Sequence, residues 1–373
     1  MKVKKILIVP AESIVEKSPA SWYGGFFVNA AKYAKRKLGQ ATSVYDAELQ
    51  RYADIPKVLG AENVLVFGKL YPHFYSSELP RLCAYPSCHG TPRAQIVSEL
   101  GMREAINAMD AVLVSARAEK RGEAAIAAAR KRNIPVAIID AHDHQSNYGK
   151  ANLWLELCRG FRHKEHFDIY FKNDLPFGYK TEYLLPLAPC PLRPESYKFR
   201  ELSKDTDLFF SGKMRARDQD DGRELLAMVR SSFGNIRFFE HAARGEFLSF
   251  SDYWNFLSRS RIALSPSRSV WDSFRHCETG LAPGTALVAP RPYLETVGPP
   301  LIDGANSILY DTELRNGKYH LTNAAELVEK MRHYLLHPGE RERLAARWQE
   351  DVLSGHTIFA RSKYIVESIE KIV

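Results

Sequence analysis

The residues from Ser265 to Glu278 have the types and the spacing of a phosphate-binding segment. Ser265 ends a short apolar run of buried-strand type, and residues 266–270 cannot continue that strand. Asp272 or Ser273 can cap a helix that carries Arg275 and Glu278. Because ligands bind outside the carboxyl ends of parallel strands and near helix N-termini, backbone N–H groups here and Arg275 are placed to hold a diphosphate. Glu278 could then accept hydrogen bonds from ribose hydroxyls, unless Arg275 and Glu278 only pair at (i, i+3) on a helix surface.

A second basic segment follows another predicted strand end. Residues 207–212 read as a strand that ends at Gly212, and Lys213 and Arg217 come soon after it. Basic side chains just past a strand-end glycine suit a diphosphate, because charge-assisted hydrogen bonds to phosphate oxygens are strong. The run to Arg223 carries both signs of charge, so the alternative is an exposed, solvated face.

Carboxylates and imidazoles gather after a predicted strand in the first half of the chain. Asp140, His142, Asp143 and His144 follow the strand predicted at 134–139. Side chains of these types can act as a general base toward a hydroxyl group, and His142 or Asp143 is our first choice, with Asp140 beside them. A His/Asp cluster can also bind a metal, and Asp140 can instead cap a solvated turn.

A glycine pair, Gly24 and Gly25, lies between the first predicted strand, at 5–9, and a helix pattern at 28–38. Such a pair lets the backbone approach a ligand closely, or lets the helix pack tightly on the sheet. The spacing differs from the GxGxxG pattern, so it does not indicate a dinucleotide site.

The opening segment resembles the donor-binding half of GT-B glycosyltransferases, and most of all the exostosin-like and spore-maturation-protein-like (CgeB-type) group. The resemblance covers residues 207–334 well and the first half only by its general layout. The matching residues are Ser265, Pro266, Asp272, Ser273, Phe274, Arg275, Glu278, Gly280, Gly284 and Pro290.

The resemblance implies a GT-B fold, in which two α/β Rossmann-like domains face each other across a cleft and a C-terminal helix crosses back to the first domain. The donor, a nucleotide sugar, would be bound by Lys213, Arg217, Ser265, Ser273, Phe274, Arg275 and Glu278, and the loop with Gly24 and Gly25 would reach the acceptor or the phosphates. GT-B enzymes do not generally need a bound metal, so we expect no metal and no cofactor besides the nucleotide sugar as co-substrate. Many retaining members carry two glutamates separated by seven residues. Here the position eight after Glu278 is Ala286, which favours an inverting transfer with a base from the first domain.

Strands and helices alternate along the chain, which predicts parallel sheets with helices on both faces. The strands are predicted at 5–9, 63–67, 111–115, 134–139, 167–172, 182–187, 207–212, 236–239, 261–265, 285–289 and 307–310. The proline-dense segment 188–194 reads as a semi-rigid linker. We therefore expect an acceptor domain at 1–195, a donor domain at 196–355 and a returning C-terminal helix at 356–373.

The composition bounds the partners. The chain has 373 residues and a net charge of +8, which favours an anionic partner such as a nucleotide sugar and leaves open contact with an acidic membrane surface. No basic block with interleaved aromatic residues occurs, so we expect no nucleic acid. The odd number of cysteines and the short apolar N-terminal run predict a cytoplasmic chain without a disulfide framework, in which any membrane contact is peripheral.

The sequence leaves the oligomeric state, the nucleotide base and the acceptor open, and a glycan, a glycolipid or a protein are all candidates for the acceptor. Two other functions fit the same two-domain architecture: a non-catalytic sugar- or nucleotide-binding protein, and a sugar-nucleotide epimerase.

Overall fold

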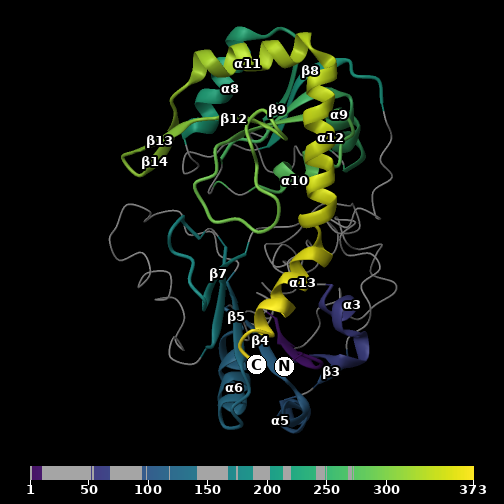
Figure 1. The fold of residues 1–373 in the computed structure, drawn as a ribbon, viewed down its shortest axis with the longest axis vertical. Coiled ribbons are helices and arrows are strands. Elements are labelled where there is room, and N and C mark those ends of the chain that lie inside the picture. Colours follow the sequence, from purple (N-terminus) through teal and green to yellow (C-terminus); the bar gives the residue numbers. More distant parts are fainter. Residues whose placement is uncertain are drawn as a thin grey trace, which may run out of the picture.

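The protein is an α/β structure built on two separate parallel sheets (Figure 1). The computed structural model describes residues 2–10, 52, 54–67, 95–97, 99–116, 118–140, 167–173, 175–187, 202–212, 220–240, 248, 250–267, 271 and 273–373. Within these ranges, no helix is long and apolar enough to cross a membrane.

The first sheet has seven parallel strands. Five of them are short, fully buried runs, which is typical of parallel strands that are covered on both faces. In spatial order they are β3 (Gln95–Val97), β2 (Val64–Phe67), β1 (Ile6–Val9), β4 (Ala111–Ser115), β5 (Val136–Asp140), β6 (Ile169–Lys172) and β7 (Leu184–Pro186). Alternate residues of β1 enter different cores: Ile6 and Ile8 pack with α3 (Ile55–Leu59) and the C-terminal helix. Leu7 and Val9 pack with α5 (Glu99–Ala105) and α6 (Glu119–Arg130). Short 3-10 turns at Ala61–Asn63 and Ile106–Ala108 lead into β2 and β4.

The second sheet has five parallel strands. In spatial order they are β12 (Ile308–Tyr310), β11 (Ala286–Pro290), β10 (Ser260–Leu264), β8 (Thr206–Gly212) and β9 (Ile236–Glu240). The helices α8 (Asp220–Ser232) and α11 (Ala324–Leu336) cover one face, and α9 (Phe250–Ser258) and α10 (Phe274–Gly280) cover the other. A hairpin of β13 (Thr312–Arg315) and β14 (Lys318–Leu321) follows β12.

The strand order of the second sheet contains a switch point. The chain places β9 on one side of β8 and then crosses to form β10 on the other side. In open parallel sheets, ligands bind in the crevice at the carboxyl ends of the two strands that flank such a point. Here those ends are Gly212, which closes β8, and Leu264, which closes β10.

The C-terminal part of the chain returns to the first sheet. The long helix α12 (Pro338–Gly355) runs beside the second sheet, and α13 (Ile358–Ile369) reaches the first, where the two termini lie close together (Figure 1). Ile365, Val366 and Ile369 of α13 pack in the same core as Ile6 and Ile8 of β1. The predicted GT-B arrangement, including its returning helix, is therefore confirmed, while the predicted boundary near residue 195 lies outside the described residues.

A second contact joins the two halves. The loop after β6 meets the loop after β11, where Pro176 and Leu294 form an antiparallel bridge. The Glu295 N–H donates to the Leu175 carbonyl at 2.6 Å, and the Gly178 N–H donates to Glu295 Oε1 at 3.1 Å. The two halves of the chain are thus joined by hydrogen bonds between these loops as well as by α13.

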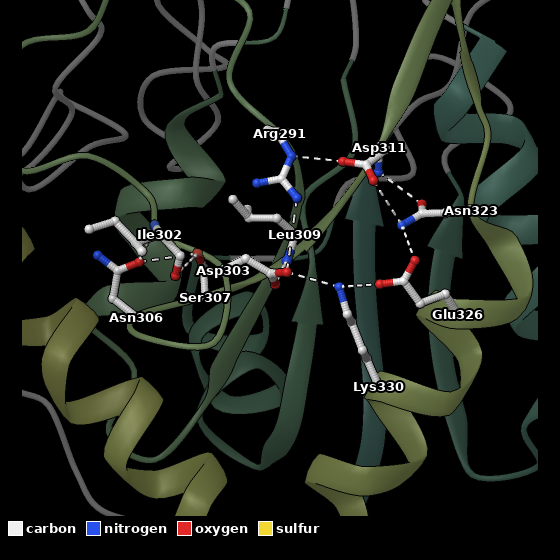
Figure 2. A network of polar contacts seen from close by, with 10 residues as sticks. All are labelled: Arg291, Ile302, Asp303, Asn306, Ser307, Leu309, Asp311, Asn323, Glu326 and Lys330. Carbon is white, nitrogen blue, oxygen red and sulfur yellow. Dashed lines mark hydrogen bonds and ion pairs between the residues drawn. The ribbon is translucent and has the colours of Figure 1, made fainter.

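A polar network fixes the segment that follows β11 against α11 and the end of β12 (Figure 2). Arg291 Nε donates to Asp311 Oδ1 at 2.7 Å, and Lys330 Nζ donates to Asp303 Oδ2 at 2.8 Å. Asp303 Oδ1 also accepts from the Leu309 N–H at 2.8 Å. These partly exposed contacts hold the loop that carries the Glu295 contact to the first half.

Candidate functional site

The predicted segment around α10 lies at the switch point of the second sheet. Ser265 directly follows β10, and Ser273 is the N-cap of α10, with its Oγ accepting from the Arg275 N–H at 3.3 Å. Asp272, the other predicted cap, lies outside the described residues. The capped turn begins α10 at Phe274, and the next residue, Arg275, reaches the end of β8.

Arg275 places a positive charge directly at the end of β8. A Cβ atom on Gly212 would lie only 2.5 Å from Arg275 Nη2, so the guanidinium occupies the space that the glycine leaves. Arg275 Cζ lies 5.6 Å from the centroid of the Phe210 ring, a cation–π contact. Arg275 Nε is buried, and none of the described residues forms a hydrogen bond with it. Among the described residues, Arg275 forms no ion pair, so its charge is available to an anionic ligand.

Glu278 lies one turn further along α10 and is buried, with 8% of its surface exposed. Its Oε2 accepts a hydrogen bond from the Tyr253 hydroxyl at 2.6 Å. Burial raises the pKa of Glu278, and the Tyr253 hydrogen bond and the charge of Arg275 offset part of that rise. The exposed surface pair of Arg275 and Glu278, which the sequence allowed, is not formed.

The turn between β10 and α10 is tied to the core through His276. Its Nε2 lies 3.2 Å from the Ser265 carbonyl, and burial lowers its pKa to about 4. A neutral imidazole with the proton on Nε2 therefore donates to that carbonyl at neutral pH. The His276 carbonyl accepts from Trp348 Nε1 at 2.7 Å. These contacts fix Ser265, whose Oγ is buried and has no hydrogen-bond partner among the described residues.

Asp140 lies at the carboxyl end of β5, as predicted, but it is paired. Asp140 and Lys172 are opposite each other in the register of β5 and β6, and Lys172 Nζ lies 3.4 Å from Asp140 Oδ2. The Tyr170 hydroxyl donates to the same oxygen at 2.7 Å. Asp140 and Lys172 are almost fully buried. The positive charge of Lys172 therefore offsets the negative charge of the carboxylate inside the protein.

The remaining predicted site residues lie outside the described residues. They are Gly24, Gly25, His142, Asp143, Lys213 and Arg217. Their roles stay predictions. In the described part of the chain, no group of three or more His, Cys, Asp or Glu side chains could hold a metal ion.

Two polar features of this edge were not foreseen from the sequence. One is Tyr253, whose only signal is its place in an amphipathic aromatic helix. The other is Asp221 in the first turn of α8, which is fully buried and accepts from the Tyr310 hydroxyl at 2.6 Å. Burial raises the pKa of Asp221 to about 6.

Comparisons with known proteins agree with this arrangement. Residues 222–367 match a protein family described as glycosyl transferase-like, which confirms the prediction of a glycosyltransferase-like enzyme. A comparison with curated protein sequences finds no match.

Among solved structures, HepE of Anabaena in complex with UDP-glucose is similar with a TM-score of 0.51 and 10% sequence identity, covering 98% of this chain and 99% of that chain. Sucrose-phosphate synthase from Thermosynechococcus elongatus gives a TM-score of 0.45 at 10% identity, over 99% of each chain. At such low identity the likeness concerns the fold. The chain therefore has the GT-B fold and carries a glycosyl transferase-like domain over residues 222–367.

Proposed function

We propose that the protein transfers a sugar from a nucleotide diphosphate sugar to a glycan, glycolipid or protein acceptor, without a bound metal. The observation that carries this proposal is the Arg275 guanidinium, seated against Gly212 at the switch point with no carboxylate partner among the described residues. A glycosyl transfer releases an anionic diphosphate, and a fixed positive charge at that place stabilises the leaving group.

The neighbouring groups supply the rest of a donor site. Ser265 Oγ, which has no hydrogen-bond partner in the part of the chain that the structure describes, can donate to a phosphate oxygen. Lys213 and Arg217 follow Gly212 in the chain and would add positive charge. Glu278 would accept hydrogen bonds from the ribose hydroxyls. HepE, which shares the fold, was solved with UDP-glucose bound, and this supports a nucleotide sugar as the ligand class.

On the acceptor side, we assign the general base to His142 or Asp143. The ion pair with Lys172 and the Tyr170 hydrogen bond favour a different role for Asp140, which is to hold the end of β5 in place. This base would take the proton of the acceptor hydroxyl while the acceptor oxygen attacks the sugar carbon and the nucleoside diphosphate leaves from the opposite side, which corresponds to an inverting transfer. The exostosin-like and CgeB-type group is the branch of the fold that we propose for the chain.

The test is titration calorimetry with UDP, GDP, ADP and CMP, followed by chromatography of nucleotide sugars incubated with the protein. We expect one nucleoside diphosphate to bind, and Arg275→Gln to weaken it at least about tenfold, as the loss of a hydrogen bond to a charged group does. Arg332→Gln is the matched control, because Arg332 also lies over a phenylalanine ring, 5.9 Å from the Phe233 centroid.

The outcomes separate the candidate functions. Binding together with release of free nucleotide supports the enzyme. Binding without turnover of any nucleotide sugar indicates a non-catalytic binding protein of the same architecture. If no nucleotide binds, or if Arg275→Gln binds as tightly as the wild type, the proposal is refuted.

A further inference from the structure

The helix α9, which precedes β10, carries Tyr253, and the hydroxyl of this tyrosine donates to Glu278. Tyr253, Trp254 and Leu257 are spaced as one apolar face of α9, which packs on the same side of the second sheet as α10. The Tyr253 ring lies 5.8 Å from the Phe209 ring and meets the Trp254 ring edge-on at 5.7 Å. Because the ring is held between these two neighbours, its hydroxyl has a fixed direction.

The Tyr253 hydroxyl forms a hydrogen bond to one carboxylate oxygen of Glu278 and not to the other oxygen. Tyr253 O–H donates to Oε2 at 2.6 Å, and no described residue forms a hydrogen bond to Oε1. A carboxylate held at one oxygen by a fixed donor cannot rotate freely about its terminal bond. Its second oxygen then keeps a constant position at the edge of the site.

We infer that Tyr253 is a positioning residue for the donor site, which orients the Glu278 carboxylate so that Oε1 can accept from a ribose hydroxyl. This inference rests on the proposed function, because it assumes that Glu278 contacts the nucleotide. Tyr253 itself need not touch the donor and acts through Glu278.

A second effect follows from charge. The titratable groups among the described residues that act on Glu278 are Tyr253 on α9 and Arg275 on α10, and both favour the ionised carboxylate against the effect of burial. Removing the Tyr253 hydroxyl raises the pKa of Glu278 further. Nucleotide binding that needs the carboxylate should then weaken more at low pH than at high pH.

The test compares the wild type with Tyr253→Phe, Glu278→Gln and the double variant. Phenylalanine keeps the ring between Phe209 and Trp254 and removes only the hydroxyl. UDP, GDP and ADP are each titrated by calorimetry at about pH 6 and about pH 8, because a carboxylate with a raised pKa is protonated to a greater extent at the lower pH. Tyr334→Phe on α11, across the sheet, is the matched control.

We expect Tyr253→Phe to weaken the nucleotide that binds the wild type by about tenfold, with the larger loss at the lower pH. The double variant should bind no more weakly than Glu278→Gln, because residues that act as one unit are not additive. Urea unfolding of the same four proteins should show the same coupling between Tyr253 and Glu278 without any ligand.

The inference is overturned if Tyr253→Phe binds as the wild type does at both pH values, or if the two losses add in the double variant. Coupling in urea without an effect on binding shows a purely structural hydrogen bond and also overturns it. A wild type that binds none of the three nucleotides refutes the proposed function first, and this inference with it.

Discussion

Replacing Gly212 by alanine tests whether the space at the end of β8 exists for Arg275. The new Cβ would lie 2.5 Å from Arg275 Nη2, 3.0 Å from Cζ and 3.2 Å from the Phe210 ring atom Cζ. The first two contacts involve the flexible end of a long side chain, so the guanidinium can move away. Gly212 is not among the glycines with positive φ, so alanine is compatible with the backbone.

The expected changes in stability and in nucleotide binding follow from the displacement of the Arg275 guanidinium. Alanine in a strand gains about 0.5–1 kcal/mol over glycine, which offsets part of the cost of displacing the arginine. Unfolding free energy should therefore change by about 1 kcal/mol or less. Nucleotide binding should lose a charge-assisted contact worth about 1.5–3 kcal/mol, which corresponds to about a 10- to 150-fold weaker Kd.

Calorimetry and urea unfolding on the same samples measure both quantities. Gly234→Ala is the matched control, because a Cβ there meets no atom of the described residues within 4 Å. Adding Gly212→Ala to Arg275→Gln should weaken binding no further, since both changes remove the same contact. If Gly212→Ala binds the nucleotide as tightly as the wild type, or unfolds, the assignment of Gly212 as the seat of the guanidinium is wrong.

Three further changes test other parts of the structure. Lys172→Met leaves Asp140 buried without its cation and should cost about 3–5 kcal/mol in urea unfolding, most of which Asp140→Leu should restore in the double variant. Gly280→Ala puts a Cβ 2.6 Å from a valine methyl of α12 and should cost about 1–3 kcal/mol, whereas Gly339→Ala, which meets nothing within 4 Å, should not destabilise the protein. The pKa of Asp221 rises from 3.8 to about 6 on folding, so the folded state binds more protons between these values and stability falls as pH rises through them. Asp221→Asn should remove about 3 kcal/mol of that fall in unfolding measurements from about pH 4 to about pH 7, and an unchanged pH slope would contradict the assignment.

The local sequence pattern was sufficient to predict most of the strands and the edge of the sheet at which the candidate site lies. The strand at 111–115 begins and ends where the apolar pattern placed it. Parallel strands bring all their carboxyl ends to one edge, so residues that follow strands in the sequence gather there in space. The hairpin at 312–321 was missed although Asn316-Gly317, both at positive φ, is a strong signal for a two-residue turn.

Contacts between elements could not be predicted in the same way. Tyr253 and Glu278 are 25 residues apart, and nothing in either local pattern pairs them. Their contact depends on α9 and α10 packing on the same face of the sheet. Likewise, Asp140 reads from the sequence as a free carboxylate after a strand, and only the register of β5 and β6 shows that Lys172 stands opposite to it.

The charged groups at the carboxyl ends of the strands are paired in the first sheet but not in the same way in the second, and this difference bears on the reaction. At the edge of the first sheet, the described carboxylate, Asp140, is neutralised by a buried lysine. At the edge of the second, His276 is kept neutral by burial, while Arg275 keeps its charge without a carboxylate partner among the described residues. Glu278 lies one turn further along α10 and is affected by the charge of Arg275, but its carboxylate accepts from the Tyr253 hydroxyl instead of pairing with the guanidinium. An edge that keeps its histidine neutral and leaves Arg275 without an ion pair among the described residues is suited to bind an anion there, which is the requirement of a departing nucleoside diphosphate.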